Sequence, residues 1–292
     1  MSTHWFPFRE AVAFRVSGKD ARRYLNSRLS NDLRSLRDGE SLVAAALTAQ
    51  GRVEALFSVF GSADDVFYLV SDGGDRQAVL GALTRCIVAD RVSVEDISTS
   101  IAYLHMSGIS SAGEIAPQPK PGCVKVSRSC SRVDEAGIDL LYIGATEDVF
   151  SEMEATHGEP LSESDYHLLR IKRGAPVFPE EVNEQVILTE CGLREAVSFS
   201  KGCYVGQEVI ERIDAIGKLP RILVRVRLSG STTAIAGEVV TNAAGQVLGK
   251  ILNAAYDSLE SKTYAFALLR SGSYIVGQQV ICNGLHGDII SE

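Results

Sequence analysis

The sequence lacks the patterns that mark a metal-binding, secreted or membrane-spanning chain. None of its 6 cysteines stands in a CxxC pair and no HExxH occurs, so no local motif predicts a zinc or iron–sulfur site. Residues 1–11 contain no apolar core of a signal peptide, and no apolar run approaches the roughly 20 residues of a membrane span. We therefore expect a cytoplasmic protein with free thiols, no metal and no membrane partner.

Positive charge is also in deficit. The chain has 29 Lys and Arg against 37 Asp and Glu, a formal net charge of -8. Such a molecule repels nucleic acid as a whole, so direct nucleic-acid binding is not expected. The nearest approach to a basic patch is Arg221, Arg225 and Arg227, which share one face of a predicted strand. We interpret that face as solvated.

The composition is that of a globular protein with more than one packed unit. The chain has 292 residues, of which 45% are hydrophobic. Residues 1–218 mix antiparallel strands with helices, which predicts an α+β region of two sub-domains joined by a Ser-, Gly- and Pro-rich loop near 108–122. From residue 219 to 292, short strand-like runs separated by Gly, Asn and Ser predict a small β-barrel domain.

Local patterns predict most of the individual elements. A cap at Ser17 with Asp20 three residues later begins the first helix, and Ser162 with Asp165 begins another that ends at Gly174. Further helices are predicted from about residue 75 and at 147–155. Strands are predicted at 42–48, 53–60, 66–70, 92–94, 101–104, 123–127 and 138–143, and in the barrel at 222–228, 238–241, 247–251, 263–269, 274–276 and 279–282.

One segment, residues 201–208, combines features that suggest chemistry. Its glycines, Gly202 and Gly206, permit a close backbone approach on either side of Cys203. A helix predicted from residue 207 to 213 would direct its N-terminal amides towards that cysteine, and with Lys201 nearby this favours a thiolate. Cys203 is therefore a candidate functional thiol, although a single cysteine is more often a small buried hydrophobe.

The same segment, Lys-Gly-Cys-Tyr-x-Gly-Gln-Glu, resembles the signature of YgfZ-type members of the glycine-cleavage T-protein-like superfamily. Other stretches are similar to that family, namely Leu168-Leu169-Arg170-Ile171-x-x-Gly174-x-Pro176, Glu190-Cys191-Gly192-Leu193 and Thr48-Ala49-Gln50-Gly51-Arg52. The resemblance implies a ring-like, multi-domain fold whose central channel binds tetrahydrofolate or a one-carbon derivative. It also implies a role in the assembly or repair of iron–sulfur client proteins, with a link to tRNA modification.

The resemblance also suggests binding residues. Glu190 matches a glutamate that contacts the pterin in the related aminomethyltransferase, and a carboxylate can accept two hydrogen bonds from the ring. Its alternative role is that of a turn carboxylate. The remaining folate-binding candidates come from the signature and the predicted helix: Lys201, Gly202, Tyr204, Gly206, Gln207, Glu208 and Arg212. Glu208 and Arg212 are four apart, so they can pair on that helix.

The sequence departs from the aminomethyltransferase at its catalytic carboxylates. That relative carries paired Asp residues after a Gly in its first domain, whereas residues 51–56 here contain only Glu54. Glu54 is thus a weak catalytic candidate, because on a strand it is equally able to face solvent. Two other functions stay open: a folate-dependent aminomethyl or methyl transferase, and a non-catalytic scaffold for a protein partner.

Overall fold

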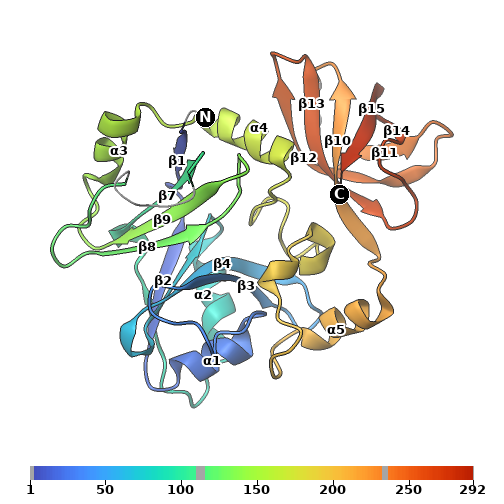
Figure 1. The fold of residues 1–292 in the computed structure, drawn as a ribbon. Coiled ribbons are helices and arrows are strands. Elements are labelled where there is room, and N and C mark those ends of the chain that lie inside the picture. The colour runs from blue at the N-terminus through green and yellow to red at the C-terminus, as the bar shows by residue number, and fades with distance from the viewer. Residues whose placement is uncertain (1–2, 110–115, 232–235, 292) are drawn as a thin grey trace.

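The computed structural model describes residues 3–109, 116–231 and 236–291. The chain forms an α+β region of two sheets, followed by a barrel, as Figure 1 shows. The predicted fold class is confirmed. The loop predicted near 108–122 falls partly on residues 110–115, which lie outside the described residues. The domain boundary at 218/219 stays a prediction.

The first sheet has five antiparallel strands in the order β3-β4-β5-β2-β6. They are β3 (Ser41–Leu47), β4 (Val53–Gly61), β5 (Phe67–Ser71), β2 (Val12–Ser17) and β6 (Ser93–Asp96). Helices α1 (Ala21–Arg28) and α2 (Arg76–Thr84) pack on it, because Leu25 and Leu83 join the apolar side chains of β3 and β4 in one core.

The second sheet has four antiparallel strands in the order β1-β7-β9-β8. They are β1 (Trp5–Pro7), β7 (Ile101–Ser107), β9 (Gly137–Ile143) and β8 (Val124–Ser129). Helix α3 (Val149–His157) packs Met153 against one face of this sheet. Helix α4 (Glu163–Arg173) follows, and its Tyr166 stacks on Phe6 with ring centroids 3.9 Å apart.

Two 3-10 turns, Leu188–Cys191 and Arg194–Ala196, and helix α5 (Gln207–Ile216) precede the barrel. The barrel is closed in the order β10-β13-β12-β11-β14-β15. Val224 and Val226 fill its interior, whereas Leu223 and Phe266 belong to the main core of the first part. The strands are β10 (Arg221–Ser229), β11 (Val239–Asn242), β12 (Val247–Asp257), β13 (Lys262–Arg270), β14 (Gln279–Cys282) and β15 (Leu285–Ser291).

The structure corrects several local predictions. Asp20, not Ser17, is the residue that precedes α1, because Ser17 is still paired in β2 and the Asp20 carboxylate accepts from the backbone amide of Arg91. Residues 274–276 form no strand, since Ile275 and Val276 are exposed in a turn. Strands β1, β2 and β15 were not predicted.

Candidate functional site

A cavity of about 650 Å³ opens where the two sheets, the segment after α4 and the barrel come together. Its apolar lining includes Leu56, Phe57, Val177, Phe178, Leu193 and Phe266, and its polar lining includes Asp72, Arg128, Arg132, Thr189, Glu195 and Arg225. A mostly apolar cavity of this size with a few convergent polar groups suits an organic ligand.

Arg128 of β8 and Arg132, in the connection that follows β8, are paired with carboxylates. Arg132 binds both oxygens of Asp72 at 2.6 and 2.8 Å and also donates to Asp139, while Arg128 donates to Asp139 at 2.8 Å. Two atoms of the lining residues are different: Arg128 Nε and Thr189 Oγ1 are buried and have no partner among the described residues. Buried polar atoms are almost always paired in proteins, so these two are unsatisfied polar atoms of residues that line the cavity.

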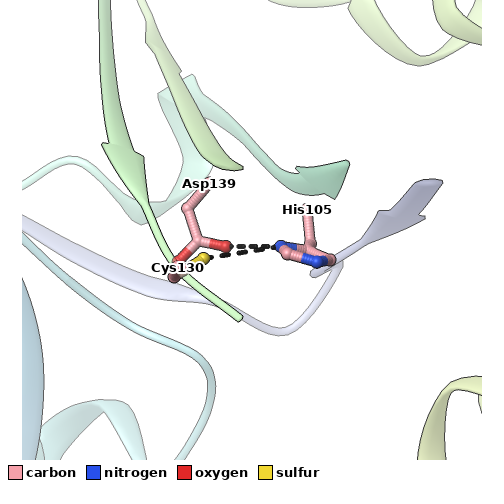
Figure 2. Close-up of side chains that lie close together, drawn as sticks. All are labelled: His105, Cys130 and Asp139. Atoms are coloured by element: carbon pink, nitrogen blue, oxygen red, sulfur yellow. Dashed lines mark hydrogen bonds and ion pairs between the residues drawn. The ribbon is translucent and has the colours of Figure 1, made fainter. Parts of the chain in front are cut away.

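Next to the lining residue Cys130, His105 and Asp139 complete a trio whose ligand-type atoms lie within 4.8 Å of one another (Figure 2). His105 Nδ1 lies 3.0 Å from Asp139 Oδ1 and 3.6 Å from the Cys130 sulfur. The Asp139 carboxylate, however, already accepts from two arginines and from Tyr103. Burial raises the pKa of Cys130 to about 12, so the thiol stays protonated. A divalent cation here would lie beside two guanidinium groups, and we interpret the trio as a hydrogen-bonded cluster.

Glu190 is fully buried but does not line the cavity. Its two oxygens accept from Arg221 of β10 at 2.9 and 2.8 Å, and Oε2 also accepts from the backbone amide of Ile187. Arg52 approaches to 3.9 Å. The structure therefore turns this carboxylate towards the barrel, while its neighbours Thr189 and Cys191 face the cavity.

Lys201 anchors the signature loop, the part of the signature segment at residues 201–206 that precedes α5, to α1. Its ammonium donates to the carbonyl oxygens of Asn26, Leu29 and Asn31 at 2.5, 2.8 and 2.6 Å, where a cation satisfies carbonyls left open by the helix end. Burial lowers the pKa of Lys201 to about 8. The Tyr204 ring lies 5.0 Å from the same nitrogen. The ammonium is thus engaged with the backbone.

Cys203, by contrast, is exposed at the surface together with Gly202. Its thiol makes no hydrogen bond to any residue that the structure describes. Gly206 precedes α5 with φ of 84°, and a Cβ there would lie 2.5 Å from the Thr48 carbonyl oxygen, so glycine is required. Helix α5 does begin at Gln207, whose side chain accepts from the Tyr204 amide.

The other candidates also lie outside the cavity. Glu208 and Arg212 are exposed, and within the described part of the chain no ion pair joins them. Glu54 is the extra residue at a bulge between β4 and β3, where it binds buried Arg28 at 2.6 Å and Arg85 at 2.6 Å. Glu54 therefore pairs with arginines on the helix-covered side of the sheet and does not line the cavity.

The sequence interpretation missed residues that the structure brings to the cavity. The three arginines of β10 do not form a solvated face: Arg221 binds Glu190, Arg225 lines the cavity, and Arg227 pairs with Asp288 at 2.9 Å. Their shared strand face was the signal, but it did not reveal the partners. For Asp72 and Arg132 the sequence offers no comparable signal.

Known proteins are similar to this chain in both sequence and fold. The GCVT N-terminal domain family matches residues 6–117. The "tRNA-modifying protein YgfZ" of Klebsiella pneumoniae is 26% identical over 234 residues, covering 76% of this chain and 71% of the relative. A putative chloroplastic transferase of Arabidopsis thaliana is 25% identical, covering 81% of this chain but only 60% of that protein. These matches support a YgfZ-type, GCVT-like relationship for this chain.

The fold agrees with this assignment. The glycine cleavage system aminomethyltransferase T from Bartonella henselae superposes with a TM-score of 0.83, covering 99% of this chain and 85% of that structure at 15% identity. At that identity the likeness establishes the GCVT-like fold and nothing about activity. No helix among the described residues is long and apolar enough to cross a membrane.

The Glu190–Arg221 pair gives a prediction about stability. Replacing Glu190 by Gln removes the charge of the buried carboxylate that binds the part-exposed Arg221, and loss of a charged hydrogen bond costs about 2 kcal/mol. Urea denaturation of Glu190→Gln should show that loss in the free energy of unfolding. The matched variant Glu208→Gln, at an exposed glutamate, should unfold like the wild type. Equal stabilities for all three proteins would contradict this role.

The buried His105 predicts acid sensitivity. Burial lowers the pKa of His105 below its ordinary 6.5, so the unfolded chain binds a proton more readily than the folded one. The stability due to the neutral ring is complete above pH 6.5 and is lost as the pH falls below it. His105→Gln should flatten the fall of unfolding free energy on the acid side of pH 6.5, measured by urea denaturation. Exposed His286→Gln should keep the wild-type slope.

The cysteines should differ in their rates of alkylation. Cys203 and Cys86 are exposed, whereas Cys191 and Cys282 are buried and burial raises the pKa of both thiols. Peptide mass spectrometry after iodoacetamide treatment of the native protein should show Cys203 and Cys86 labelled first. Cys86 is the internal reference: faster labelling of Cys203 would indicate an activated thiolate, and uniform slow labelling of all cysteines would refute the expected order.

Proposed function

We propose that this protein binds tetrahydrofolate or a one-carbon derivative in the central cavity and acts in the assembly or repair of iron–sulfur proteins, with an indirect link to tRNA modification. The observation that carries the proposal is the cavity of about 650 Å³ in a GCVT-like fold. Its walls offer both the apolar surface and the unpaired polar atoms that a pterin requires.

The lining fits the chemistry of a folate. Phe178 offers aromatic surface for a flat ring, whereas Phe57 and Phe266 belong to the lining but are almost fully buried. Thr189 Oγ1 and Arg128 Nε are buried and unpaired among the described residues, so a ligand that reaches either atom can form a hydrogen bond with it. Glu190 accepts hydrogen bonds from Arg221, and this pairing holds the neighbouring residues Thr189 and Cys191 in the cavity lining. In this proposal its contribution to binding is indirect.

The signature loop supplies a second functional surface. Cys203 is exposed and lies outside the cavity lining, on a loop that Lys201 anchors to α1. An exposed thiol on a fixed loop is suited to contact with an iron–sulfur client protein. The YgfZ relatives are named tRNA-modifying proteins, which supports the proposed link to tRNA modification. We therefore assign Cys203 as the functional thiol of the protein-facing side.

A folate-dependent aminomethyl or methyl transferase is the second candidate, because aminomethyltransferases are among the relatives. Such a reaction requires a carboxylate beside the substrate amine. Glu54 is held by Arg28 and Arg85 outside the cavity, and Asp72 in the lining is held by Arg132. These pairings favour ligand binding over proton transfer.

Anaerobic calorimetric titration with tetrahydrofolate tests the proposed site. The wild type should bind with one-to-one stoichiometry. Ala175→Trp places a large ring in the cavity lining and should abolish binding, whereas Ala215→Trp, on an exposed position of α5, should bind like the wild type. No heat of binding for the wild type, or full binding by Ala175→Trp, would refute folate binding in this cavity.

A further inference from the structure

Strand β10 carries three arginines, and one of them differs from the other two. Arg221 binds Glu190, and Arg227 binds Asp288 at 2.9 Å. Arg225, between them, has no carboxylate within 4.0 Å among the residues that the structure describes. The other two arginines that line the cavity in the described part of the chain both have such a partner: Arg128 binds Asp139, and Arg132 binds Asp139 and Asp72.

Two hydrogen bonds hold the Arg225 guanidinium in place. Nε donates to Ser291 Oγ at 2.6 Å, and Nη1 donates to the Lys172 carbonyl oxygen at the end of α4. The remaining nitrogen, Nη2, makes no hydrogen bond to the described residues. Gly174 leaves the room for this arrangement, because a Cβ there would lie 3.1 Å from Nε. The side chain is thus oriented by its neighbours and keeps a free donor.

A purely structural role accounts for only part of this arrangement. A cation at the C-terminal end of α4 is favourable, and the bond to Lys172 uses that preference. It does not explain why a half-buried guanidinium in a cavity wall lacks a counter-ion. Burial and the nearby Arg173 both lower the pKa of Arg225, so its charge is not compensated within the described protein. The Glu195 carboxylate also lines the cavity but is exposed.

We propose that Arg225 is an anion-binding subsite of the cavity, which holds a carboxylate of the bound ligand against the barrel. This inference rests on the proposed function: for tetrahydrofolate, the group is a glutamate carboxylate. Guanidinium and carboxylate groups match in geometry and form charge-assisted hydrogen bonds. The ligand then spans the cavity, with its rings among the aromatic side chains and its anionic end at β10.

The test compares tetrahydrofolate with its bis-amide, in which both glutamate carboxylates are neutral. Calorimetric titrations are made with the wild type, Arg225→Met and the matched variant Arg227→Met. Loss of a charged hydrogen bond predicts that Arg225→Met binds tetrahydrofolate about ten- to a hundredfold more weakly. The same variant should bind the bis-amide as the wild type does. Arg227→Met should bind both ligands normally, and Arg225→Lys should restore part of the affinity for tetrahydrofolate.

The outcomes separate this inference from the proposed function. If Arg225→Met loses nothing, or weakens both ligands equally, Arg225 acts only as a helix-end partner and the subsite is refuted. If inorganic phosphate binds the wild type but not Arg225→Met while tetrahydrofolate affinity is unchanged, the residue takes a free anion and the ligand-carboxylate assignment is wrong. If the wild type binds neither folate, the proposed function fails and the assignment falls with it. Urea denaturation of each variant shows that the compared proteins are folded.

Discussion

The ion pair between buried Glu190 and part-exposed Arg221 is the interaction on which we expect the cavity wall to depend. It fixes the 3-10 turn Leu188–Cys191 to the first strand of the barrel. Both sides of that junction contribute to the cavity wall, Thr189 and Cys191 from the turn and Arg225 from the strand. A carboxylate taken out of water is costly unless it is paired and hydrogen-bonded, and here one guanidinium satisfies both of its oxygens. The Glu190 carboxylate therefore positions residues of the cavity lining without lining the cavity itself.

The functional residues fall into two separate regions. The cavity is lined by side chains from both sheets, the segment after α4 and the barrel, whereas the signature residues 201–208 lie outside that lining. Lys201 explains the difference, because its ammonium is directed under α1 and leaves Cys203 at the surface. A ligand in the cavity and a thiol on the loop can then serve different partners. The proposed folate site and the proposed client-facing thiol therefore lie in different regions of the protein.

The sequence predicted features that depend on local chemistry. The Ser162 cap and the Gly174 end of α4 and the start of α5 at Gln207 all follow from nearby residues, and the structure contains them. Strand β2 was missed although Val12, Phe14 and Val16 alternate, which is the signal that would have found it. The cavity wall was beyond local patterns. Glu190 and Arg221 are 31 residues apart, and Arg132 and Asp72 are 60 apart, so their pairing is decided by tertiary structure.

Hydrogen–deuterium exchange with and without tetrahydrofolate tests most directly the claim that the ligand occupies the cavity and not the signature loop. We expect slower exchange on ligand addition in the segments 128–132, 174–178 and 189–195, which carry residues of the cavity lining. We expect unchanged exchange in residues 201–206, where Cys203 is exposed. Protection confined to the signature loop, with none in the cavity segments, would contradict the claim.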